Sequence, residues 1–205
     1  MSSKPYAPHC DRNREPILEV LRRWFADRKN VLEVGSGTGQ HAVAFAAQLS
    51  HLRWQTSDVA ENLPGIRMWV DEAHLPNLPP PLELDVSERW PLLPYDAAFS
   101  ANTLHIMTWH EVRKLFAGLA RALTPDATLA IYGPFNYSGR FTSDSNAGFD
   151  RSLKERSPSM GIRDFEAVDA LARSAGFDLV EDCAMPANNR TLVWRRERPA
   201  KSGAS

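Results

Sequence analysis

The sequence predicts an α/β fold in which a mostly parallel sheet carries helices on both faces. Helical and strand-like patterns alternate along the middle of the chain, as they do in successive βαβ units. A short apolar strand over 31–34 runs into a turn that contains three glycines. Two strand patterns follow one another near the C-terminal end, and strands joined in this way form an antiparallel hairpin. We expect that hairpin to extend the same sheet.

The first half of the chain is expected to contain three helices and three strands. A helix over 16–26 places Ile17, Leu21 and Phe25 on one face. A proline-rich loop over 76–81 separates the last helix of this half from the strand that follows it. The other expected elements are helices over 40–49 and 66–74 and strands over 31–34, 52–56 and 82–86.

The second half repeats the alternation and ends in the two consecutive strands. The clearest helix covers 111–123, where Val112, Leu115 and Leu119 recur at spacings of three or four residues. Gly176 is placed to end the last helix, because glycine readily adopts the left-handed conformation found after helix C-termini. The other expected elements are a helix that Asp164 caps and that runs to 175, and strands over 95–100, 128–132, 177–181 and 191–196.

Length, composition and charge point to one soluble domain. The 205 residues suggest a single domain over 1–205, with disordered tails over 1–5 and 198–205. Apolar residues make up 43% of the chain and the formal net charge is −1, so nothing draws the whole chain to nucleic acid or to a membrane. The first residues lack the apolar core of a secretion signal. We therefore expect a cytoplasmic location.

The cysteines and histidines predict no metal site. Cys10 and Cys183 form neither a disulfide framework nor a metal-type spacing, and in a reducing compartment both are expected to be free thiols. Cys10 precedes a helix that is expected to border the site, so it is either functional or simply packed. The six histidines are scattered and none pairs with cysteine or carboxylate at ligand spacing.

The most informative motif is the glycine-rich turn after the first strand. Gly35, Gly37 and Gly39 stand at alternate positions, and Glu33 lies two places before the first of them. A dinucleotide fingerprint has its third glycine one residue later, and a carboxylate here would repel a diphosphate. We expect the turn and the next helix to offer backbone N–H groups to a cationic ligand. S-adenosylmethionine fits, because it carries an ammonium group and a positively charged sulfur. The alternative is a tight turn that binds nothing.

Carboxylates follow the second and third strands. In an open α/β sheet, ligands bind outside the carboxyl ends of the strands. Asp58, nineteen residues after Gly39, is expected to accept hydrogen bonds from the ribose hydroxyls. Asp85 is expected to accept a bond from the adenine amino group, and the apolar Val86 to pack on the ring. For both aspartates, the alternative is a capping role in a loop.

The ends of the fourth and fifth strands are expected to lie nearest the transferable methyl group. Asn102 is a candidate for holding the methionyl group or the substrate. His105 either takes a proton from the nucleophile, since its ordinary pKa lies near neutrality, or only orients its neighbours through hydrogen bonds. Tyr132 either donates a hydrogen bond to the substrate or packs in the core.

Two polar segments are expected to form the substrate wall. The first, 143–150, contains Asn146 and is interpreted as a lid, because loops over the ligand end of such a sheet usually carry specificity. The second carries Asn188 and Asn189, whose side-chain amides can donate and accept. Turn formation is the alternative role for these two asparagines.

Taken together, these residues resemble a known group over roughly residues 10–195. The chain resembles a class I S-adenosylmethionine-dependent methyltransferase and, more narrowly, the methyltransferase-like protein 26 family. The resemblance implies the seven-strand Rossmann-like methyltransferase fold and binding of S-adenosylmethionine, with S-adenosylhomocysteine as product. It also implies that Arg12 and Asn13 cover the donor or contact its carboxylate, with helix capping as the alternative. The motifs that carry it are Arg12-Asn13 with Pro16-Ile17-Leu18, Leu32-Glu33-Val34 with Gly35-Ser36-Gly37-Thr38-Gly39-Gln40-His41, Trp54-Gln55-Thr56-Ser57-Asp58, Leu84-Asp85-Val86, Asn102 with His105, Tyr132-Gly133-Pro134, Ser145-Asn146 with Phe149-Asp150, Gly161-Ile162-Arg163-Asp164, and Met185-Pro186-Ala187-Asn188-Asn189.

The sequence therefore predicts in-line transfer of a methyl group to an oxygen, nitrogen or sulfur nucleophile. A small-molecule acceptor is expected, because the fourth strand end lacks the Asn/Asp-Pro-Pro-aromatic run of amino-methylating enzymes and no basic module is added for a polynucleotide. A protein acceptor stays open, and the chain is expected to act as a monomer or homodimer. The rival hypotheses are a nicotinamide-dependent reductase and a module that binds the donor without catalysis.

Overall fold

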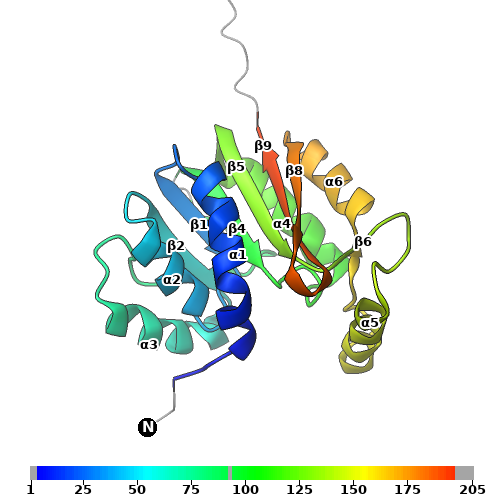
Figure 1. Ribbon diagram of the computed structural model, residues 1–205. Coiled ribbons are helices and arrows are strands. Elements are labelled where there is room, and N and C mark those ends of the chain that lie inside the picture. The colour runs from blue at the N-terminus through cyan, green and yellow to red at the C-terminus, as the bar shows by residue number, and fades with distance from the viewer. Residues whose placement is uncertain (1–3, 92–93, 197–205) are drawn as a thin grey trace, which may run out of the picture.

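A seven-stranded sheet forms the centre of the structure, a computed structural model that describes residues 4–91 and 94–196 (Figure 1). The strand order is β3-β2-β1-β4-β5-β9-β8. Neighbours from β3 to β5 are parallel, whereas β9 runs antiparallel to both β5 and β8. The predicted parallel sheet with a C-terminal antiparallel hairpin is thus confirmed. The strands are β1 Asn30–Val34, β2 Arg53–Asp58, β3 Leu82–Glu83, β4 Tyr95–Ala101, β5 Leu123–Gly133, β8 Asp178–Met185 and β9 Asn189–Arg195.

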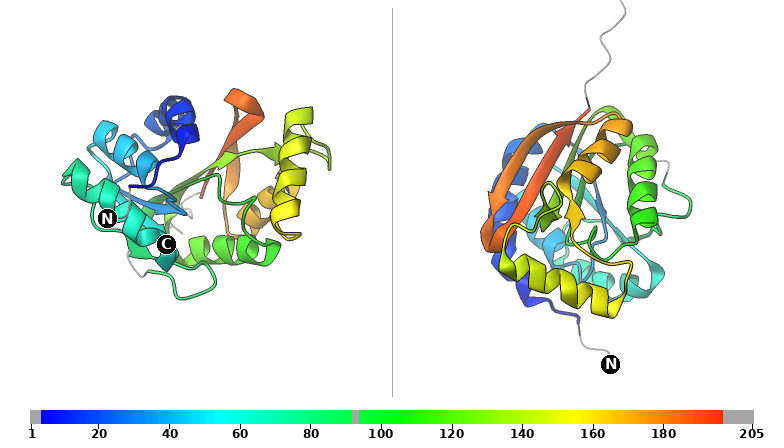
Figure 2. Two further views of the ribbon diagram at one scale, coloured as in Figure 1. Left: turned by 90° about the horizontal axis from the view of Figure 1, so that it is seen from below. Right: turned by 90° about the vertical axis from the view of Figure 1, so that its right-hand side faces the viewer.

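Helices cover both faces of this sheet, as predicted. On one face α1, α2 and α3 pack around Trp54 and Phe99, and on the other α4 and α6 pack around Leu129 and Trp194. Figure 2 shows the two layers from below the sheet. Alternate strand residues point to opposite faces, so each strand contributes to both cores. The helices are α1 Pro8–Trp24, α2 Gln40–Gln48, α3 Leu63–Ala73, α4 Trp109–Ala122, α5 Asp144–Arg156 and α6 Phe165–Ser174, with the 3-10 helices η1 Ala60–Asn62 and η2 Pro186–Asn188 and a small parallel pair of β6 Phe135–Asn136 and β7 Arg163–Asp164.

Two helices differ from the expectation. The first helix begins at Pro8, and Pro16 lies inside it. Proline favours the first helical turn, and two prolines compete for that position here. The polar segment 143–150 is not a loop, because it forms most of α5, which is capped by the Ser143 hydroxyl. The buried face of α5 consists of Asn146, Asp150 and Leu153, so it carries no apolar periodicity.

Three strands also differ from their predicted bounds by three residues or more. The strand expected over 128–132 begins at Leu123, where the preceding helix was expected to end. The third strand ends at Glu83, which leaves Asp85 and Val86 beyond it. The first strand of the C-terminal hairpin continues to Met185 rather than ending at 181. Its burial is intermediate along most of its length, which weakens the alternation that a half-buried strand shows.

The chain ends were expected to form disordered tails. Residues 1–3 and 198–205 lie outside the described residues. Lys4 and Pro5, by contrast, contact α3 through Glu72 and Trp69. Across the described ranges, no helix combines the length and the apolar character needed to cross a membrane.

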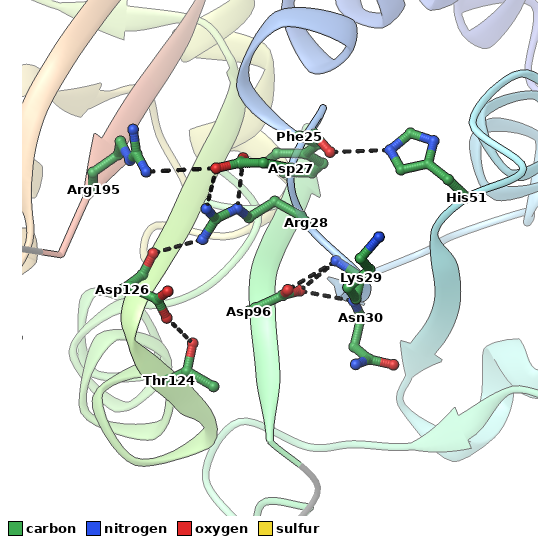
Figure 3. A network of polar contacts seen from close by, with 10 residues as sticks. All are labelled: Phe25, Asp27, Arg28, Lys29, Asn30, His51, Asp96, Thr124, Asp126 and Arg195. Carbon is green, nitrogen blue, oxygen red and sulfur yellow. Dashed lines mark hydrogen bonds and ion pairs between the residues drawn. The ribbon is translucent and has the colours of Figure 1, made fainter. Parts of the chain in front are cut away.

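A polar network fixes the amino ends of β1, β4 and β5, opposite the ends where ligands bind (Figure 3). The Asp96 carboxylate accepts hydrogen bonds from the backbone N–H groups of Lys29 and Asn30 at 2.7–3.0 Å. The Arg28 side chain is 6% exposed, pairs with Asp27 and donates to the Asp126 carbonyl at 2.7 Å. The network therefore ties the entry of β1 to the amino ends of β4 and β5.

Replacing Arg28 by methionine should lower the free energy of unfolding by about 2 kcal/mol, because the Asp126 carbonyl loses its charged donor. Urea denaturation measures the change. Arg195→Gln is the matched control, since Arg195 lies 4.0 Å from Asp27 and is 42% exposed; it should cost at most about 0.5 kcal/mol. Equal losses in the two variants would contradict a buried role for Arg28.

Candidate functional site

A cavity of about 550 Å³ opens at the carboxyl ends of β1 and β4. Its walls come from four segments that are far apart in the sequence, together with His41 of α2. These segments are the N-terminal stretch 5–10, the turn 35–38, the stretch 61–68 at the start of α3, and residues 101–102 at the end of β4. Ligands bind at this end of open α/β sheets, so the cavity is the candidate site.

The glycine-rich turn is held by the end of β2. The N–H groups of Gly35 and Ser36 both donate to the Ser57 carbonyl at 3.0 Å. The Gly37 N–H donates to Asp58 Oδ2 at 2.7 Å. Protein oxygens therefore already accept these three N–H groups, which were expected to be offered to a ligand.

Glycine is required at the first two positions of the turn for different reasons. Gly35 has φ +74°, and a Cβ there would lie 2.7 Å from the Thr103 side chain. Gly37 has φ +60°, and a Cβ there would meet nothing within 4 Å. Side chains other than glycine rarely adopt these φ values. The turn therefore packs tightly at Gly35 and stays open toward the cavity at Gly37.

Glu33 lies behind the turn rather than in the cavity wall. It is 2% exposed, and Oε2 accepts hydrogen bonds from the Ser36 hydroxyl and the Trp54 indole, both at 3.0 Å. Burial, together with the nearby Asp58 charge, raises the pKa of Glu33 to about 7 against the opposing effect of the two hydrogen bonds. Its contacts support the turn from inside the fold.

The other predicted carboxylates have protein partners as well. Asp58 Oδ1 accepts bonds from Val59 N–H and from the Asn62 side chain, both at 2.8 Å. Asp85 is exposed, and its Oδ1 accepts a 2.8 Å bond from the Ser87 N–H. That contact is the capping role that was the alternative for Asp85. The buried Val86 lies beside it, and neither residue lines the cavity.

The N-terminal segment is fastened across the cavity to α3. The Trp69 indole donates to the Pro5 carbonyl at 2.7 Å. Lys4 pairs with Glu72 at 2.6 Å and lies 3.7 Å from the Trp69 ring centroid. The Ala7 N–H donates to Gln40 Oε1 at 2.6 Å. No sequence motif marks this fastening, because it joins isolated residues more than thirty positions apart.

Helix α1 contributes His9 and Cys10 to the cavity wall. Cys10 lines it, and burial raises the pKa of the thiol to about 11, so the thiol stays protonated at neutral pH. Asn13 is buried behind the wall, and its Oδ1 lies 2.7 Å from His41 Nε2. Arg12 is exposed and does not line the cavity.

The residues expected to face the acceptor surround the ends of β4 and β5. Asn102 has φ +57°, lines the cavity, and donates its N–H to the Tyr132 carbonyl at 2.9 Å. His105 is buried with its ring 5.2 Å from that of Phe149, edge to face. Burial, together with the positive charges of Arg163 and Arg156, lowers the pKa of His105 to about 4. The imidazole is therefore neutral at pH 7.

The predicted substrate-wall residues are joined to each other. Asn146 Nδ2 donates to the Asn188 carbonyl at 3.2 Å, and Asn188 Nδ2 donates to the Ser145 hydroxyl at 3.4 Å. These bonds fasten α5 to the β8–β9 turn (Figure 1). Tyr132 is buried, which raises the pKa of its hydroxyl, while hydrogen bonds from Asn13 and Asn189 lower it.

The cavity wall thus contains only part of the predicted donor site. Of the predicted residues it includes Gly35, Ser36, Gly37, His41 and Asn102. Those that lie outside the wall are Arg12, Asn13, Glu33, Gly39, Gln40, Asp58, Asp85 and Val86. The wall residues that sequence reasoning missed are Pro5, Ala7, His9, Thr38, Glu61, Asn62, Pro64, Gly65, Met68 and Ala101.

The titratable side chains form no metal centre within 4–91 and 94–196. No three or more histidine, cysteine, aspartate or glutamate side chains gather there in a way that could hold an ion.

Residues 4–196 match the family model described as "Protein of unknown function (DUF938)". An O-methyltransferase family protein from Burkholderia thailandensis is similar in structure, with a TM-score of 0.80 at 16% identity over 90% of this chain and 56% of that chain. An O-methyltransferase family 2 protein from Planctomyces limnophilus DSM 3776 in complex with apigenin has a TM-score of 0.79 and 16% identity, over 90% of this chain and 56% of that chain. PigF with SAH has a TM-score of 0.75 and 15% identity, over 88% of this chain and 54% of that chain. The shared feature is the fold, and this chain spans little more than half the length of these proteins.

Replacing Glu33 by glutamine should flatten the pH dependence of stability. A pKa raised to about 7 means that the folded state favours the protonated carboxyl. The protonated Glu33 therefore adds to the free energy of unfolding below the ordinary glutamate pKa, and this contribution is lost as pH rises through about 7. The loss is at most about 3 kcal/mol. The glutamine side chain keeps one oxygen for Ser36 and Trp54, so the variant should lose less stability than the wild type between pH 5 and 8.5.

Urea denaturation across that pH range measures the effect, with Glu83→Gln at the exposed end of β3 as the control. Parallel pH curves for the wild type and Glu33→Gln would contradict a protonated Glu33.

Proposed function

The chain belongs to the DUF938 family, and we propose that it is an S-adenosylmethionine-dependent methyltransferase acting on a small-molecule acceptor. The proposal rests on the fold, on the position of the cavity, and above all on the occupied N–H groups of the turn. The closer kinship with the methyltransferase-like protein 26 family is part of the same proposal, and it suggests no acceptor.

The partners of the turn favour one kind of nucleotide over another. A diphosphate bound at a glycine-rich turn needs free N–H groups, whereas Gly35, Ser36 and Gly37 donate theirs to Ser57 and Asp58. A diphosphate here would also approach the Asp58 carboxylate. A nucleoside that carries positive charge would be attracted by the same carboxylate. This observation carries the proposal and argues against a nicotinamide-dependent reductase.

The residues around the cavity fit the parts of such a donor. Gly37 leaves open space beside its backbone, which admits the close approach of a ribose. Asp58 Oδ2 accepts one N–H group and keeps a second lone pair for a ribose hydroxyl. Asn102 and His41 also line the cavity and offer polar groups there. When bound, S-adenosylmethionine supplies an electrophilic methyl group on a sulfonium that is already a good leaving group.

The acceptor would lie beyond the ends of β4 and β5. Alignment of the nucleophile and exclusion of water supply most of the catalysis that such a transfer needs. His105 is neutral and a weak base at pH 7, because its pKa is lowered to about 4. We therefore assign it hydrogen bonding to the acceptor, and we assign α5 and the turn at Asn188 and Asn189 the outer wall. Apigenin in the Planctomyces protein is a small molecule of the kind proposed.

Calorimetric titration with S-adenosylhomocysteine tests donor binding. The wild type should bind it, and Asp58→Ala should weaken the affinity at least tenfold, because both the ribose partner and the acceptor for the Gly37 N–H are lost. Asp71→Ala removes an exposed carboxylate from α3 and should leave the affinity within twofold.

Incubation with methyl-labelled S-adenosylmethionine and a metabolite extract tests transfer. Labelled small molecules are expected with the wild type. Binding of NADH without binding of S-adenosylhomocysteine would overturn the proposal in favour of a reductase. Donor binding without transfer to any fraction would replace the enzyme with a non-catalytic donor-binding module.

A further inference from the structure

A row of buried and half-buried polar side chains runs from the donor cavity to the acceptor side. It consists of His41 in the cavity wall, Asn13 on α1, Tyr132 at the end of β5 and Asn189 at the start of β9. His41 and Asn13 are each 7% exposed and Tyr132 is 3% exposed. Buried polar groups of this kind must find partners within the protein, and here the partners are one another.

The contact between Asn13 and His41 fixes the histidine. Asn13 Oδ1 lies 2.7 Å from His41 Nε2, and an amide oxygen can only accept. Nε2 must therefore carry the proton. The ring also stacks on Phe45, one helical turn along α2, with the centroids 5.3 Å apart and the planes 5° apart. One contact sets the plane of the imidazole and the other sets its tautomer.

The other end of the same amide faces Tyr132. With its oxygen turned to His41, Asn13 has its NH₂ group left for the Tyr132 hydroxyl, and the side chains of Asn13 and Asn189 both lower the pKa of that hydroxyl. Asn189 is held in turn by a 3.3 Å bond from Nδ2 to the Pro186 carbonyl. This part of the row reaches η2, the turn that Asn146 fastens to α5.

We propose that Asn13 is a positioning residue of the site: its single side-chain amide orients His41 in the donor cavity and Tyr132 on the acceptor side. The inference rests on the proposed function. Asn13 then acts through its two partners and does not touch the donor, which agrees with its place behind the cavity wall. Tyr132, with a partner on each side, acts by holding Asn189 and the β8–β9 turn rather than by exchanging a proton.

Two variants separate the two ends of the amide. Asn13→Leu removes both hydrogen bonds, whereas Asn13→Asp keeps an acceptor for His41 and removes the donor toward Tyr132. Glu15→Gln on the exposed face of α1 is the control. Long-range ¹⁵N–¹H spectra report the tautomer and charge of His41, and calorimetric titration with S-adenosylhomocysteine reports the affinity.

The wild type is expected to show only the Nε2–H tautomer at pH 7. Burial lowers the pKa of His41 to about 4 in the wild type. Asn13→Asp should raise that pKa, because a carboxylate beside the ring favours its charged form, and Asn13→Leu should lose the single tautomer. Both should bind S-adenosylhomocysteine at least tenfold more weakly, with Glu15→Gln within twofold of the wild type.

A His41 pKa that is unchanged across a pH titration, together with unchanged affinity, in Asn13→Asp would overturn the inference, and this holds even where Asn13→Leu does not fold. Failure of the wild type to bind S-adenosylhomocysteine would instead count against the proposed function. The two failures are therefore distinguishable.

Discussion

The site depends on the contact between the glycine-rich turn and the end of β2. The backbone N–H groups of Gly35, Ser36 and Gly37 donate hydrogen bonds to Ser57 and Asp58. Glu33, which lies behind the turn, accepts a hydrogen bond from the Ser36 hydroxyl. Because the last residues of β1 and β2 are neighbours in the parallel ladder, the sheet itself delivers these acceptors. The turn therefore has its shape before any ligand binds. The groups of the turn that can contact a ligand are those that have no partner in the protein.

What remains free is open space and carboxylate charge rather than N–H groups. Gly37 lines the cavity with its open side, and the Asp58 carboxylate lies behind the wall, bonded to the Gly37 N–H. The same preorganisation extends outward, because α1 is tied to the turn helix by Gln40 and to the β5 end by Asn13. In the proposed site, the donor side and the acceptor side are parts of one polar frame, and preorganised polar groups of this kind support catalysis without further rearrangement.

The sequence was sufficient for the fold because the strands and the helices on both faces obey simple periodicities. The glycine-rich turn was also predictable, because three glycines that follow an apolar strand with Glu33 form a local motif. The role of Glu33 was not predictable in the same way. Whether a carboxylate faces a cavity or a neighbouring indole depends on Trp54, which is twenty-one residues away.

Other misses have equally specific causes. Helix α5 buries asparagine and aspartate, so a hydrophobic pattern cannot reveal it. The start of α1 was misplaced because Pro8 and Pro16 both suit a first helical turn. The N-terminal wall of the cavity depends on single long-range contacts, such as Trp69 with Pro5. Contacts of that kind leave no local signal in one sequence.

The most direct test of this arrangement is a crystal structure of the protein with S-adenosylhomocysteine. The ligand should lie between the turn, α3 and the 5–10 segment, with the Gly37 N–H still bonded to Asp58 and the ribose beside that carboxylate. A ligand bound elsewhere, or a turn whose Gly37 N–H has left Asp58 to contact the ligand, would contradict a site that is shaped by β2.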